Sequence, residues 1–127
     1  MTELNKTYGY KYHDGTGLDD ELLASDQYQM ISITIDTAAR DVDNVGYETT
    51  LRRGLVLVLS SGKYTIPPDA TLNATAVVLA ETVPGIDAGD VVAKAYYKAT
   101  FKTGKVLDPG GYMDFAECPR LSVRDNA

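Results

Sequence analysis

The stretch that decides the fold runs from Leu51 to Phe101 and reads LRRGLVLVLSSGKYTIPPDATLNATAVVLAETVPGIDAGDVVAKAYYKATF. It holds short apolar runs separated by turn-forming residues, a pattern typical of β-strands. We expect strands at 54–59, 64–66, 75–80 and 91–101. The Ser61-Gly62 pair predicts a tight reversal after the first of them, because glycine tolerates the positive φ that such turns use.

The run from Gly54 to Leu59 is apolar at every position. Such a strand is covered on both faces, either within its own fold or at a contact between subunits. On the second alternative, the contact between subunits would be formed by Leu55, Leu57 and Leu59.

The strand expected at 91–101 alternates between two faces. One face carries mostly small apolar residues together with Tyr97 and Phe101. The other carries lysines and Tyr96 and should face water.

Outside this stretch, residues 29–36 alternate cleanly and predict a half-buried strand, and residues 121–123 predict a last edge strand. No long helix is predicted. One or two helical turns are expected near residues 18–24. The chain is therefore expected to be mainly β, a small β-barrel or sandwich with little helix, in residues 28–127.

Residues 1–27 differ in composition, being rich in glycine and acids, and are expected to form an extended N-terminal arm. Tyr8, Tyr10 and Tyr12 alternate along it, which places three rings on one face of an extended chain. Two interpretations stay open. The segment orders against a partner's sheet edge, or it is the first strand of this protein's own sheet.

The chain has 127 residues and a net charge of −6, so we expect one domain that does not bind nucleic acid. No run is long enough for a membrane helix, and no secretion signal is expected. A calcium loop at 41–52 fails at Val45 and Arg52, and neither phosphate-binding nor dinucleotide motifs are complete. With one histidine, His13, and one cysteine, Cys118, no catalytic residues, metal site or cofactor are predicted.

Four segments in a fixed order resemble the head decoration, or cement, proteins of tailed phages of the phage lambda type. They are Arg53-Gly54-Leu55-Val56-Leu57, Gly62-Lys63-Tyr64, residues 76–83 and residues 88–95. The resemblance covers less than half of the chain, and residues from Asp108 onward depart from it.

This resemblance implies a β-tulip-like domain and a homotrimer on the surface of the expanded bacteriophage capsid. Its arm would bind the major capsid protein, and the assembly would stabilise the head against the pressure of packaged DNA. The protein would be made in the cytoplasm of the bacterial host and reside in the virion, as a structural protein and not an enzyme. The alternative from the residues alone is a monomeric β-sandwich that binds glycans through Tyr96, Tyr97 or Tyr112.

Overall fold

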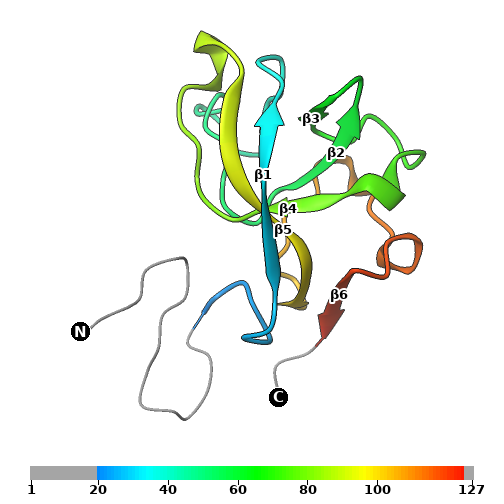
Figure 1. The fold of residues 1–127 in the computed structure, drawn as a ribbon. Coiled ribbons are helices and arrows are strands. Elements are labelled where there is room, and N and C mark those ends of the chain that lie inside the picture. The colour runs from blue at the N-terminus through cyan, green and yellow to red at the C-terminus, as the bar shows by residue number, and fades with distance from the viewer. Residues whose placement is uncertain (1–19, 125–127) are drawn as a thin grey trace.

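A computed structural model describes residues 20–124 of the chain. These residues are mainly β and form a closed barrel of five strands, as expected (Figure 1). The strands are β1 (Gln29–Ile35), β2 (Val56–Ser60), β3 (Lys63–Thr65), β4 (Val77–Leu79), β5 (Val91–Lys102) and β6 (Leu121–Arg124). Helix in the described residues is confined to the single 3-10 turns η1 (Asn73–Thr75), η2 (Ile86–Ala88), η3 (Pro109–Gly111) and η4 (Phe115–Glu117).

The barrel follows the order β1-β3-β2-β4-β5 and closes where β5 pairs with β1. That closing pair is antiparallel and runs from Gln29 opposite Lys98 to Ile35 opposite Val91. β6 lies outside the barrel and pairs in parallel with the far end of β5. Figure 1 shows β5 as the long curved strand that joins the barrel to β6.

Two apolar cores share the strands β2 and β4. The inner core fills the barrel and contains Leu55, Leu57, Val77 and Leu79 from these strands. The outer core covers their other face. It consists of alternate residues of the same two strands and residues from both ends of the described chain, among them Val56, Val58, Val78, Leu22, Leu23, Phe101, Cys118 and Leu121. The chain itself covers both faces of this run from Gly54 to Val58, whereas Leu59 at its end is exposed.

The hairpin between β2 and β3 turns at the predicted pair. Ser61 has φ 54° and Gly62 has φ 83°, so both lie in the left-handed region that a tight two-residue reversal requires. The turn places Ser60 opposite Lys63 and fixes the register of the two strands.

One prediction about β5 is wrong. Tyr96, expected on the wet face, is 1% exposed, and Tyr97, expected inside, is 39% exposed. Tyr96 does point away from Ala95 and the inner core, as the alternation predicts, but the outer core covers that face. Tyr97 is displaced by a bulge: Gln29 pairs with Lys98 and Met30 with Tyr96, so Tyr97 has no partner on β1. An extra residue shifts the alternation of the strand by one. Ala93 and Ala95 therefore face the inner core, whereas Ala99 and Phe101 face the outer one.

The helical turns expected near residues 18–24 do not form in the part of that segment that the structure describes. Leu23 instead forms a bridge with Phe101, and the backbone of Leu22 and Ala24 bonds to Lys102 and Thr100. The Asp20 side chain accepts the N–H groups of Leu22 and Leu23 and bends the chain toward β5. Residues 20–27, expected to belong to the arm, are thus packed onto the barrel domain.

Candidate functional site

The side chains expected at the trimer contact lie at different depths. Leu55 and Leu57 are fully buried in the inner core and have no surface to offer to another chain. Leu59 is 36% exposed, so it is the member of the set that can reach a neighbouring subunit. Tyr8, Tyr10 and Tyr12, expected in the capsid-binding arm, lie outside the described residues.

A charged anchor fastens the N-terminal segment to the barrel. Arg53, just before β2, donates to both carboxylate oxygens of Asp20, at 3.3 Å from Nη1 and 3.0 Å from Nη2. The next residues, Leu22 and Leu23, are buried in the outer core. We call Asp20, Leu22, Leu23 and Arg53 the anchor. Its polar and apolar parts act together to hold the chain at Asp20 against the barrel.

Arg53 connects the anchor to the outer core. Its Nη2 donates to the Tyr96 hydroxyl at 2.8 Å, and its Nε donates to the Ala80 carbonyl at 3.1 Å. The Tyr96 ring packs edge-to-face against Tyr28 and Phe101. Burial raises the pKa of Tyr96 above its ordinary value, although the Arg53 charge opposes that effect. The hydroxyl therefore stays protonated and neutral at physiological pH.

The anchor should be sensitive to acid. Burial alone would raise the pKa of Asp20, but the hydrogen bonds from Leu23, Arg53 and Leu22 outweigh it and lower that pKa below 3.8. The contribution of Asp20 to stability is therefore complete above about pH 4 and is lost as the pH falls through the folded-state pKa. We expect urea midpoints of Asp20→Asn to lie below those of the unchanged protein at pH 6 and to converge with them as the pH falls through the folded-state pKa of Asp20. Equal midpoints at pH 6 would contradict this.

Three large apolar side chains stand out on the loop between β1 and β2. Val42 is 58%, Val45 81% and Tyr47 71% exposed, and we call these three residues the apolar loop tip. The loop beneath them is braced by Asp41, which is fully buried and binds the guanidinium of Arg52 through both oxygens, at 2.7 and 3.1 Å. The loop that carries these exposed side chains is therefore held in place by a buried ion pair.

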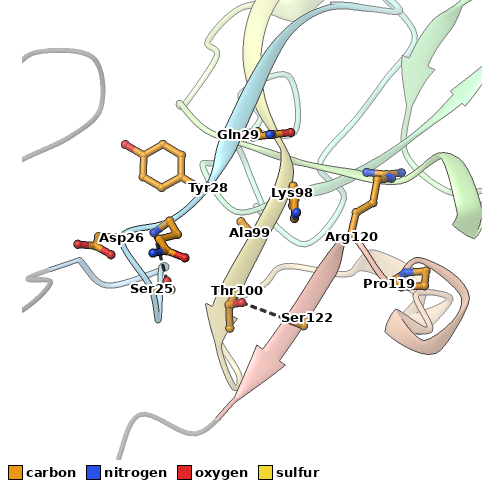
Figure 2. A pocket seen from close by; sticks show the side chains of 11 residues that line it. Ser25, Asp26, Tyr28, Gln29, Lys98, Ala99, Thr100, Pro119, Arg120 and Ser122 are labelled. Atoms are coloured by element: carbon orange, nitrogen blue, oxygen red, sulfur yellow. Dashed lines mark hydrogen bonds between the residues drawn. The ribbon is translucent and has the colours of Figure 1, made fainter.

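A groove of about 480 Å³ crosses the outer face of the far half of β5 (Figure 2). Lys98 and Thr100 of β5 form its floor. Residues 25–29 form one wall, with Asp26 and Tyr28 drawn on that side in Figure 2, and Arg120 and Ser122 form the other. We call it the basic groove. Its open and largely polar lining suits a hydrated ligand better than an apolar one.

The tyrosines expected to bind glycans are not equivalent. Tyr96 belongs to the outer core and cannot serve as a platform for a sugar ring. Tyr97 is partly exposed, but the Arg120 guanidinium lies 4.0 Å from its ring centroid and stacks on it. Tyr112 is 40% exposed. The bulge in β5 exposes Tyr97 and the outer core buries Tyr96, and a simple alternation along the strand predicts neither.

Titratable groups elsewhere in the described chain are engaged in holding the fold. The Cys118 thiol is buried against the carbonyls of Ala74 and Ala76. Asp90 pairs with Lys63 at 2.5 Å and accepts the Thr37 N–H at 2.9 Å. Residues 20–124 contain no group of three or more His, Cys, Asp or Glu side chains placed to hold a metal ion. They also contain no helix that could span a membrane.

Sequence reasoning missed the anchor, the buried Asp41 and the second wall of the basic groove. The segment that holds Asp41 and Arg52 resembles only an incomplete calcium loop in the sequence, which does not indicate that the two residues pair. Asp20 and Arg53 are far apart in the chain, so no local pattern joins them. A charge pattern alone does not reveal such pairs, because any of several acids could have met these arginines. A comparison with known proteins found no matching family and no curated sequence that matches the chain.

Proposed function

We propose that this protein is a structural component of a phage virion, which binds the expanded capsid as a trimer and stabilises the head. The proposal starts from the order of sequence segments that resembles the decoration proteins. The observation that supports it best is the anchor. A segment fixed at Asp20 and Arg53 ties the residues before it to a rigid barrel, as a capsid-binding arm requires.

The anchor sets a limit on where such an arm can act. Tyr12 precedes Asp20 by eight positions. An extended chain of that length spans at most about 28 Å. Tyr8, Tyr10 and Tyr12 would therefore add to a capsid sheet close to the barrel, with main-chain hydrogen bonds giving affinity and alternate rings giving fit. Three such arms in one trimer would bind with high effective concentration.

The apolar loop tip supplies a second contact that fits the proposal. Its three side chains are too few for a stable interface of the usual size, about 800 Å² for each partner. They suit a contact that forms once another tether has brought the surfaces together. In the proposed assembly, this contact is made to a neighbouring protein of the shell.

Cosedimentation with capsids tests the proposal. The shells are assembled from the major capsid protein whose gene lies nearest to the gene of this protein. Binding is compared between unexpanded and expanded shells. We expect the full chain to be trimeric by analytical ultracentrifugation and to sediment with expanded shells alone. Replacing the three tyrosines with Ser should abolish sedimentation and leave the barrel folded. A strict monomer, or equal binding by the triple variant, would refute the proposal.

The glycan-binding alternative has its support in the basic groove, whose lining offers hydroxyls and carboxamides. Sugars are bound by such mixed donors and acceptors. A glycan array is the direct test, with Tyr112→Ala and Tyr97→Ala as variants. A clear hit by a monomeric protein would favour this alternative over the capsid.

A further inference from the structure

The outer face of β5 and β6 carries an unusual arrangement of positive charge. Lys102 of β5 lies opposite Arg124 of β6, and Thr100 lies opposite Ser122. One step further along, Arg120 bonds to both neighbours of Lys98: its carbonyl accepts the Ala99 N–H, and its guanidinium donates to the Tyr97 carbonyl. Two pairs of cations thus flank a pair of hydroxyls, which are 3.0 Å apart.

Like charges on directly opposite residues destabilise a sheet, so this arrangement calls for an opposite charge. Among residues 20–124 the ion pairs are Arg52–Asp41, Arg53–Asp20 and Lys63–Asp90, none of which involves this face. Asp26 contributes one carboxylate to the far wall of the groove. Lys98 and Arg120 line the groove together with Asp26, whereas Lys102 and Arg124 lie beyond its lining on the same face of the sheet.

The two arginines are held in place by neutral groups. Arg120 donates to the carbonyls of Tyr97, Ala74 and Ala76. Arg124 donates to the Ala24 carbonyl at 2.8 Å. Ala24 itself bonds to Thr100 on the edge of β5 that faces away from β6, so the Arg124 side chain crosses the strand at the end of the groove. These bonds fix the guanidinium groups without neutralising them.

From this geometry we propose that the basic groove, together with the adjoining pair Lys102 and Arg124 on the same face, binds an extended acidic segment of a partner protein. Lys98 and Lys102 are four residues apart on one strand, which corresponds to about 13 Å. Carboxylates four positions apart on an extended peptide have the same spacing, so one could meet Lys98 and Arg120 and the other Lys102 and Arg124. The hydroxyls of Thr100 and Ser122 lie between them, where the peptide backbone would pass.

An acidic peptide fits this site better than a nucleic acid does. The protein carries a net charge of −6, so a long polyphosphate would be repelled by most of its surface. A short segment with two carboxylates contacts the four cations and little else. Binding through exposed charges is expected to be moderate in affinity and to weaken with salt. The inference does not rest on the proposed function.

Fluorescence anisotropy with a labelled peptide tests it on the full-length protein. The probe is an extended serine-rich peptide with two Asp residues four positions apart, compared with the same peptide carrying Asn and with an oligothymidine. We expect binding of the Asp peptide at low salt and none of the Asn peptide. In the double variant Lys98→Gln, Lys102→Gln the affinity should fall about tenfold or more.

The matched control is Lys94→Gln with Lys105→Gln, which removes the same charge from exposed positions that belong neither to the groove nor to the Lys102–Arg124 pair. It should bind the peptide nearly as the unchanged protein does, and circular dichroism should show both variants folded. Equal weakening in both double variants would overturn the proposal, because the effect would then be one of net charge. Failure of the Asp peptide to bind, or tighter binding of oligothymidine, would overturn it as well. A negative capsid assay would leave the inference intact, since this experiment contains no capsid.

Discussion

A chain that begins at Tyr28 is expected not to fold, whereas a chain that begins at Asp20 is expected to fold. The difference is the anchor. Leu22 and Leu23 are buried in the outer core, and the loss of a buried leucine side chain costs about 2–5 kcal/mol. Two such losses approach the whole stability of a small domain, about 5–15 kcal/mol. Phe101, which Leu23 bridges, would also be opened to water.

The two truncated chains are compared by circular dichroism and urea unfolding. The chain from Asp20 should keep a cooperative transition close to that of the full protein, and the chain from Tyr28 should show none. The double variant Leu22→Ala, Leu23→Ala in the full chain separates the packing from the loss of length, and it should unfold at much lower urea. A cooperative transition in the chain from Tyr28 would mean that residues 20–27 are dispensable for the fold.

Replacement of Tyr96 by Ala is expected to destabilise the protein by about 3–5 kcal/mol, the usual cost of removing a large buried ring. The ring is in edge contact with Tyr28 and Phe101. When the Tyr96 hydroxyl is removed, Arg53 also loses a hydrogen-bond acceptor. Chemical unfolding measures the change, and Tyr97→Ala, one position along, is the matched control with an expected effect below about 1 kcal/mol.

The stabilities of Tyr96→Ala and Tyr97→Ala also decide how a sugar-binding experiment should be interpreted. A loss of binding in Tyr96→Ala would report damage to the fold, and only Tyr97→Ala and Tyr112→Ala probe exposed rings. Tyr96→Phe keeps the ring and removes the hydroxyl, so it should lower the free energy of unfolding much less than Tyr96→Ala does. Equal stability of Tyr96→Ala and Tyr97→Ala would contradict the burial of Tyr96 and the exposure of Tyr97.

The strands could be predicted from the sequence because each has a local signal. Alternation marks β1 and most of β5, continuous apolar character marks β2 and β4, and Ser61-Gly62 marks the turn between β2 and β3. The closure of the barrel is not local. It depends on the pairing of β1 with β5, and a barrel and a sandwich were equally compatible with the same strands.

The features that could not be predicted from the sequence depend on the register of strand pairing and on contacts between residues far apart in the chain. One unpaired residue, Tyr97, reverses the alternation of β5, and nothing in the neighbouring residues marks it as a bulge. The acidic composition of residues 20–27 predicts that they belong to an arm. In the structure Leu22 and Leu23 are buried in the outer core and Asp20 pairs with the distant Arg53, so this segment packs onto the barrel. The lysines of β5 were visible as a weak cluster. Arg120 and Arg124 join them only through the parallel pairing of β6.

The closing pair of the barrel has a consequence for synthesis on the ribosome. β1 finds its antiparallel partner only when residues 91–98 have left the exit tunnel. Until then β2 and β4, which are apolar on both faces, remain exposed because neither the inner core nor the outer core is complete. Nascent chains with such strands exposed are prone to aggregate, and folds dominated by distant pairings form slowly. A ribosome-bound chain that stops before β5 should therefore recruit chaperones strongly, and this association should fall once β5 has emerged.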